Sequence, residues 1–141
     1  MKKILILAGG YSKEKEISIQ TAKSVIYELN KDKKYILKVV NPDGQFIKVL
    51  RKFKPNVVLN LLHGRYGEDG YIQAILESEE IKYTHSGVLS SSLAIDKELS
   101  KKIFIRNKIL TPKFLKYSFK NPINKKQFLE KLKSKLGFPL I

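Results

Sequence analysis

The chain has 141 residues, no cysteine and a formal net charge of +15 at pH 7. Its length is enough for one domain with a core of its own and the start of a second. With 43% hydrophobic and 29% charged residues, the composition is that of a folded protein rather than a disordered one. The sequence excludes disulfides and thiolate metal sites, and no apolar run approaches the roughly 20 residues of a membrane-spanning helix.

The positive charge is concentrated in the last third of the chain. Residues 1–96 carry 15 basic and 11 acidic residues, whereas residues 97–141 carry 13 basic and 2 acidic ones. Such a basic segment can contact nucleic acid, a membrane surface or nucleotide phosphates, or it can consist only of solvated lysine-rich faces. The lysines lie among apolar residues with helical spacing, which favours solvated faces, but charge alone does not decide the question.

The first 86 residues alternate between apolar runs of strand length and helical patterns. The opening MKKILILAGG is too short for a signal peptide and lacks a cleavage site, so we expect a first strand at 3–8 and a cytoplasmic protein. The next expected elements are a helix with Ser12 as N-cap that runs to about Leu29, a strand at 35–41, a short helix at 46–53, a strand at 57–62, a helix at 71–80 and a short strand at 81–86. Apolar strands that alternate with helices, each buried on both faces, indicate a parallel sheet built from βαβ units.

From about Ser90 the pattern changes. The expected elements are a long basic helix over 90–108, an extended segment over 110–119, and a helix whose apolar face is Phe128, Leu129, Leu132 and Leu136 and whose C-cap is Gly137. The final residues, FPLI, are typical of the start of a strand, and such a strand needs neighbours to pair with. We therefore expect the chain to be truncated.

Two segments fall at the carboxyl ends of predicted strands, where parallel sheets bind ligands. The first, GGYSKEKE, lacks the third glycine and the acidic ribose partner of a dinucleotide-binding fingerprint. It places Glu14 near a helix N-terminus, where a carboxylate tends to stay ionised. Glu14 then either binds a ligand ammonium or only complements the helix dipole, and the local sequence leaves both interpretations open.

The second segment, HGRYGEDG, follows the third predicted strand. Its glycines let the backbone turn sharply and approach a ligand closely. His63, at the strand end, can donate a hydrogen bond to a carboxylate or phosphate, or it can be structural. Glu68 and Asp69 can bind a cation, or Asp69 can cap the next helix. One histidine beside two adjacent acids is not a metal-binding set of known spacing.

Four blocks, in order and in register, resemble the D-alanine–D-alanine ligases of the ATP-grasp superfamily. They are GGYSKEKEISI at 9–19, LLHGRYGEDGYIQAILE at 61–77, YTHSGVLSSSLAIDKELSK at 83–101 and LTPKF at 110–114, and their span takes in most of the chain. The resemblance implies an α/β fold in which residues 1–96 form a parallel-sheet, Rossmann-like pre-ATP-grasp domain. Residues 97–141 would be the incomplete beginning of the central ATP-grasp domain.

The resemblance also implies roles for individual residues. Glu14 would be the catalytic carboxylate that holds the ammonium of a first D-alanine, and His63 would lie near the carboxyl end of that substrate. Gly64 and Gly67 would shape the substrate pocket, and Lys97 would contact a phosphate of ATP. The implied reaction is ATP-dependent joining of two D-alanines through an acyl phosphate, for peptidoglycan precursor synthesis. The ligands of Mg²⁺ and the second D-alanine site would lie in the part that follows residue 141, so this chain alone is expected to be inactive. The resemblance further implies a homodimer.

The sequence departs from the family's pattern at two internal positions, and two alternatives stay open. Ala74 and His85 stand where the family usually has glycine. Another ATP-grasp amino-acid ligase would fit the same blocks, because the residues that select the second substrate would lie elsewhere. A small basic nucleic-acid-binding protein is a further alternative, motivated by the charge of residues 97–141, but the sequence lacks the interleaved aromatics and groove-reading motif of such proteins.

Overall fold

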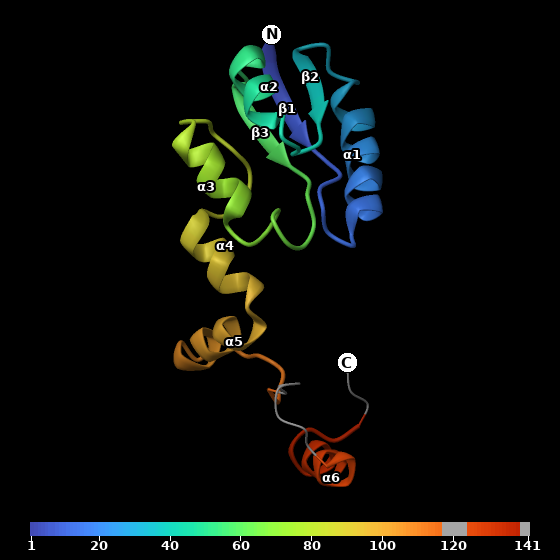
Figure 1. Cartoon of the computed structure of the whole chain (residues 1–141), viewed down its shortest axis with the longest axis vertical. Helices are drawn as coiled ribbons and strands as arrows, with labels where there is room; N and C mark the ends of the chain where they lie inside the picture. Colours follow the sequence, from blue (N-terminus) through green and yellow to red (C-terminus); the bar gives the residue numbers. More distant parts are fainter. Residues whose placement is uncertain (117–123, 139–141) are drawn as a thin grey trace. The chain divides into compact units, whose positions relative to one another are not determined.

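The structure is a computed structural model that describes residues 1–116 and 124–138. The chain divides into two compact units, Met1–Asp96 and Lys97–Ile141. Figure 1 shows the elements of both units in chain order. Among the described residues, no helix has both the length and the apolar character that a bilayer span requires.

The first unit is built on a parallel sheet of three strands in the order β2-β1-β3. Strand β1 (Lys2–Leu7) lies in the middle and pairs in parallel with β2 (Tyr35–Val40) and with β3 (Val57–Asn60). The β1–β3 register sets Leu7 opposite Asn60, so both strands end at the same edge of the sheet. The α/β fold with a parallel sheet is therefore confirmed.

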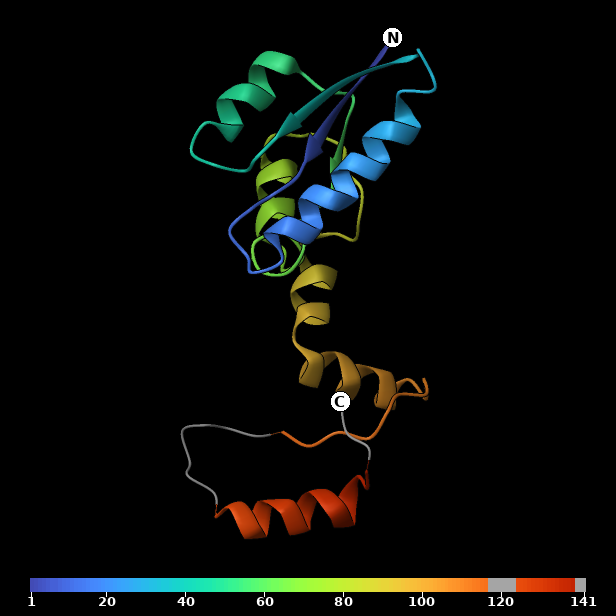
Figure 2. The same ribbon diagram turned by 90° about the vertical axis from the view of Figure 1, so that its right-hand side faces the viewer.

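Helices cover both faces of this sheet (Figures 1 and 2). Helix α1 (Lys15–Leu29) lies on the face to which Ile4 and Ile6 of β1 point. Helices α2 (Phe46–Phe53) and α3 (Tyr71–Ser78) lie on the other face. The buried residues of that second core are Leu5, Leu7, Phe46, Leu50, Val58, Leu62, Ile72 and Leu76. Each such side chain stabilises the fold by roughly 1.5–3 kcal/mol on burial, so β1 is held in place from both sides.

Two predicted strands differ from the structure. Strand β2 is only half-buried, because it is an edge strand with one neighbour, so the expectation that every strand is buried on both faces is wrong for β2. Residues 81–86 do not form a strand; they contribute one parallel bridge between Val58 and Tyr83. The φ of +91° at His85 turns the backbone out of the extended conformation directly after this bridge.

Two predicted helix features are also wrong. The single helix expected over 90–108 is two helices, α4 (Val88–Ile95) and α5 (Lys97–Arg106). Asp96 separates them, because its φ of −81° and ψ of 101° are extended and end α4. Aspartate is also a favoured residue directly before the first residue of a helix, and α5 begins at the next residue. Ser12 is not the N-cap of α1, because that position is occupied by Glu14.

The second unit contains α5 and α6 (Lys125–Lys135). Glu98 in the first turn of α5 forms ion pairs with Lys102, at 2.6 Å, and with Lys116. Asn124 caps α6 by accepting a hydrogen bond from the backbone of Lys126 at 2.9 Å. The predicted extended segment is irregular up to residue 116, and its remainder lies outside the described residues, as do the last three residues of the predicted FPLI strand.

Candidate functional site

The candidate site lies where β1 and β3 end side by side. The loop after β1 leads through residues 8–14 into α1, and the segment after β3 runs from residue 61 to the start of α3. Because the two strands are parallel neighbours, both segments emerge at the same edge of the sheet. The structure thus brings Glu14, from the segment after β1, to the segment after β3. That second segment contains the other predicted site residues, His63, Gly64 and Gly67.

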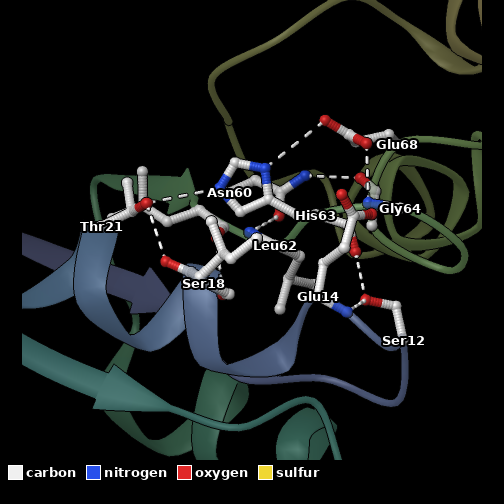
Figure 3. Close-up of polar contacts among 12 residues, drawn as sticks. Ser12, Glu14, Ser18, Thr21, Asn60, Leu62, His63, Gly64 and Glu68 are labelled. Carbon is white, nitrogen blue, oxygen red and sulfur yellow. Dashed lines mark hydrogen bonds and ion pairs between the residues drawn. The ribbon is translucent and has the colours of Figure 1, made fainter. Parts of the chain in front are cut away.

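Two serine hydroxyls join these segments (Figure 3). The Oγ of Ser18 accepts from the backbone N–H of Gly9 at 2.9 Å and donates to the carbonyl of Leu61 at 2.6 Å. The Oγ of Ser12 accepts from the N–H of Glu14 at 3.0 Å and donates to the carbonyl of His63 at 2.7 Å. Each hydroxyl both donates and accepts a hydrogen bond. The segment after β1 and the segment after β3 are therefore held together at two points, one at Ser18 and one at Ser12.

Glu14 directs its carboxylate against Gly64. A Cβ added to Gly64 would lie 2.5 Å from Oε2 of Glu14, and the φ of Gly64 is +70°. The backbone conformation favours glycine at position 64, and a Cβ there would have to displace the carboxylate of Glu14. Glu14 occupies the N-cap position of α1, but its side chain makes no capping hydrogen bond. Its carboxylate oxygens are thus not engaged in capping α1 and lie exposed beside the turn.

His63 lies between α1 and the glycine-rich turn, and its side chain is 33% exposed. Its Nε2 is 3.4 Å from the hydroxyl of Thr21 on α1. Its Nδ1 is 3.9 Å from Oε1 of Glu68. The other oxygen of Glu68 accepts from the backbone N–H of Gly64 at 2.7 Å. The imidazole is thus flanked by a hydroxyl on one side and a carboxylate on the other.

The turn itself is held by buried amides. The carbonyl of Gly67 accepts from the side-chain amides of Asn60, at 2.8 Å, and Gln73, at 3.0 Å, and both of these side chains are fully buried. A Cβ on Gly67 would lie 2.4 Å from the Cβ of Leu62, so the turn packs directly on the strand exit. Asp69 accepts from the N–H of Tyr71 at 3.2 Å, at the start of α3. Asp69 therefore supports the turn and the start of the helix.

A cavity of about 650 Å³ adjoins this site. It shares His63 and Gly67 with the candidate site, but Glu14 does not line it. Tyr11, Tyr66 and Tyr71 contribute to its wall. The ring of Tyr66 makes edge contacts to the other two at centroid distances of 6.4 and 5.3 Å. The cavity is therefore a hollow with an aromatic wall that borders the polar site at His63 and Gly67.

Lys97 is the first residue of α5 and belongs to the second unit, so it is described apart from the other predicted site residues. Within residues 1–116 and 124–138, no three His, Asp or Glu side chains gather into a group that could hold a metal ion.

Sequence reasoning missed three residues that organise the site: Ser18, Thr21 and Asn60. Two of them, Ser18 and Asn60, had a signal in the sequence. Ser18 lies four residues before Ala22, on the apolar face of the predicted helix, and Asn60 interrupts an otherwise apolar strand. A small polar residue at an apolar position is buried only when it is hydrogen-bonded. Thr21 had no such signal, because its partner His63 is 42 residues away in sequence.

No protein-family model matches the chain. It is 54% identical over 140 residues to the D-alanine–D-alanine ligase of Pelagibacter ubique and 37% identical over 139 residues to that of Carboxydothermus hydrogenoformans. These matches cover 99% of this chain but only 45% and 44% of the relatives, so the chain spans less than half of their length.

The fold agrees with the sequence match. The structure superposes on that of the Bacillus anthracis D-alanine–D-alanine ligase solved in complex with ATP, with a TM-score of 0.75 and 35% identity, over 94% of this chain and 45% of that one. Agreement in both sequence and fold does not favour the nucleic-acid-binding alternative. Over its whole length the chain is homologous to the amino-terminal portion of the D-alanine–D-alanine ligases.

Proposed function

We propose that this chain is the amino-terminal part of an ATP-dependent ligase that joins two D-alanines to D-alanyl-D-alanine for peptidoglycan precursor synthesis. The observation that supports it best is the placement of the Glu14 carboxylate against Gly64, on the same sheet edge as His63. An exposed carboxylate outside any capping bond suits a substrate ammonium, and an imidazole on the same edge suits the carboxyl end of the same small molecule.

In the proposed reaction, the first D-alanine is bound through its ammonium by Glu14 and lies with its carboxylate near His63. The closely packed turn at Gly64 and Gly67 forms the wall of the pocket. In the proposed first step the γ-phosphoryl group of ATP passes to the substrate carboxylate, which gives an acyl phosphate and ADP. The amine of the second D-alanine then attacks the acyl carbon, which forms the peptide bond and releases inorganic phosphate and a proton. The residues of this chain bind and orient the first substrate, which is the entropic part of catalysis.

The remaining features of the proposal concern the rest of such a ligase. Residues 1–96 would be the pre-ATP-grasp domain and residues 97–141 the beginning of the ATP-grasp domain, with Lys97 on a phosphate of ATP. The ligands of Mg²⁺ would lie in the portion of the relatives that this chain does not span. A cytoplasmic homodimer is part of the same proposal. The 141 residues alone should not complete the reaction.

A chimera tests the proposal. Residues 1–141 are joined to the remaining part of the Pelagibacter ubique relative, and D-alanyl-D-alanine formation from D-alanine and ATP is measured. Loss of a charge-assisted hydrogen bond predicts that Glu14→Gln lowers kcat/KM roughly 10- to 150-fold. Glu16→Gln, two residues further on in the first turn of α1, should stay within about twofold.

Two outcomes would overturn the proposal. One is a folded chimera that makes no D-alanyl-D-alanine while the parent relative does. The other is equal activity of the two glutamate variants, because it would remove Glu14 from the substrate site.

A further inference from the structure

The hydroxyl of Thr21 has only one hydrogen, and a backbone carbonyl one turn earlier in α1 takes it. The Oγ1 of Thr21 donates to the carbonyl of Ile17 at 2.9 Å. The same oxygen lies 3.4 Å from Nε2 of His63. Since a hydroxyl has one donor and two acceptor positions, Thr21 can meet His63 only as an acceptor while it keeps its bond to the helix. Nε2 of His63 must then carry the hydrogen.

The other ring nitrogen faces a different environment. Nδ1 of His63 lies 3.9 Å from Oε1 of Glu68, and Glu68 is anchored through its second oxygen to the backbone N–H of Gly64. In a neutral imidazole one nitrogen is the donor and the other carries the lone pair. A hydrogen fixed at Nε2 leaves the lone pair at Nδ1, on the side of a carboxylate that would itself favour a hydrogen there. At 3.9 Å, however, Oε1 of Glu68 is beyond hydrogen-bond distance and does not accept from the ring, so the contact with Thr21 decides the tautomer.

The position of the imidazole is also restrained at its backbone. The carbonyl of His63 accepts from the Oγ of Ser12 at 2.7 Å. Helix α1 and the loop before it therefore contact His63 twice, once at the main chain through Ser12 and once at the ring through Thr21 (Figure 3). A hydrogen-bond partner at one ring nitrogen, here the hydroxyl of Thr21, sets both the orientation of the imidazole and the nitrogen that carries the hydrogen.

We propose that Thr21 is a positioning residue, whose hydroxyl holds His63 in the tautomer with hydrogen on Nε2 and leaves the lone pair on Nδ1, the nitrogen that faces Glu68. The importance of this tautomer for ligation rests on the proposed function. The tautomer itself does not depend on it, because it follows from the contacts of Thr21 alone.

The test uses two-bond ¹H–¹⁵N correlation spectra of the 141-residue chain with ¹⁵N-labelled histidine. The chain has only two histidines, so His85→Gln assigns both sets of signals. Spectra are recorded at a pH at which the titrated His63 signals show a neutral ring. Thr21→Val removes the hydroxyl at nearly constant volume, Thr21→Ser restores it, and Thr21→Ala is a second hydroxyl-free variant should valine disturb α1.

The wild-type chain and Thr21→Ser should show His63 with hydrogen on Nε2. In Thr21→Val and Thr21→Ala the ratio of the Nε2–H form to the Nδ1–H form should fall about fivefold, as loss of one neutral hydrogen bond predicts. A wild-type His63 with hydrogen on Nδ1, or a tautomer ratio unchanged in both hydroxyl-free variants, would overturn the inference. An inactive chimera whose His63 shows the expected tautomer would overturn the proposed function and leave the role of Thr21 intact.

Discussion

Substitution of Ser18 by alanine should strongly destabilise the first unit, although it removes a single oxygen atom. Ser18 is fully buried, and its hydroxyl is the hydrogen-bond partner of both the Gly9 N–H and the Leu61 carbonyl. These two groups belong to the segments that follow β1 and β3. An alanine methyl group can satisfy neither of them, so the variant leaves a donor and an acceptor unpaired at the junction.

The magnitude follows from the burial of the two groups. A buried polar group left without a partner costs about 1–3 kcal/mol. Gly9 is buried and Leu61 is half-buried, so the first group should lie at the upper part of this range and the second at the lower part. Alanine regains about 0.5 kcal/mol because it is the better helix former. The free energy of unfolding should fall by about 2–4 kcal/mol.

Urea unfolding followed by tyrosine fluorescence measures this loss, since six of the seven tyrosines lie in residues 1–96. Ser24→Ala is the matched control: it lies in the same helix, is exposed, and its hydroxyl makes only a 3.4 Å bond to the carbonyl of Gln20. It should change the free energy of unfolding by less than about 0.5 kcal/mol. Equal stabilities of the Ser18 and Ser24 variants would refute the reasoning, because both gain the same helix propensity.

Three further predictions concern a strained residue, a pH dependence and a close contact. His85→Gly should raise the free energy of unfolding by roughly 0.5–1 kcal/mol, because the φ of +91° is costly for any residue except glycine. Hydrogen bonds and ion pairs, first with Lys102, lower the pKa of Glu98 below its ordinary value of 4.5, so its contribution to stability is present above that value and is lost as the pH falls through the folded-state pKa. Glu98→Gln should therefore make amide exchange in α5 less sensitive to acid. Gly64→Ala should cost about 1–2 kcal/mol from its φ of +70°, and it should displace the Glu14 carboxylate.

Each of these has a decisive control measurement. For position 85, His85→Ala loses the imidazole but keeps a Cβ at the same φ, so a gain in stability with alanine equal to that with glycine would contradict the backbone argument. For Glu98, an unchanged acid dependence in the glutamine variant would contradict the role of the ion pairs. For Gly64, the chimera should lose affinity for D-alanine; unchanged kcat/KM would show that the carboxylate does not lie against this glycine.

The sequence was sufficient for the features that depend on local pattern. The apolar run at 3–8 predicted β1 within one residue at each end, because its alternating side chains fill two cores. The loops with Glu14 and His63 were expected at one sheet edge, because parallel strands separated by helices leave no other arrangement. The edge character of β2 was missed, since strand order depends on pairings that no single segment contains.

The hydrogen bonds that organise the site were beyond the reach of the sequence for a physical reason. Ser12 was interpreted as an N-cap because serine before an acidic helical turn is typical of one. Its hydroxyl instead bonds the carbonyl of His63, 51 residues away. A local pattern carries no information about such a partner, so a residue with two competing roles is assigned to the nearer one.

The central position of β1 has a consequence for how the chain is made. Of the three strands of this sheet, β1 is synthesised first, and its neighbours follow much later: Lys3 pairs with Ile36, and Ile4 pairs with Val57. One hydrogen-bonding edge of β1 therefore stays unpaired until β3 has been synthesised, and closing such long loops slows folding. The nascent chain should depend on chaperones during this interval, and the sheet should form in a single late step once residue 60 has emerged.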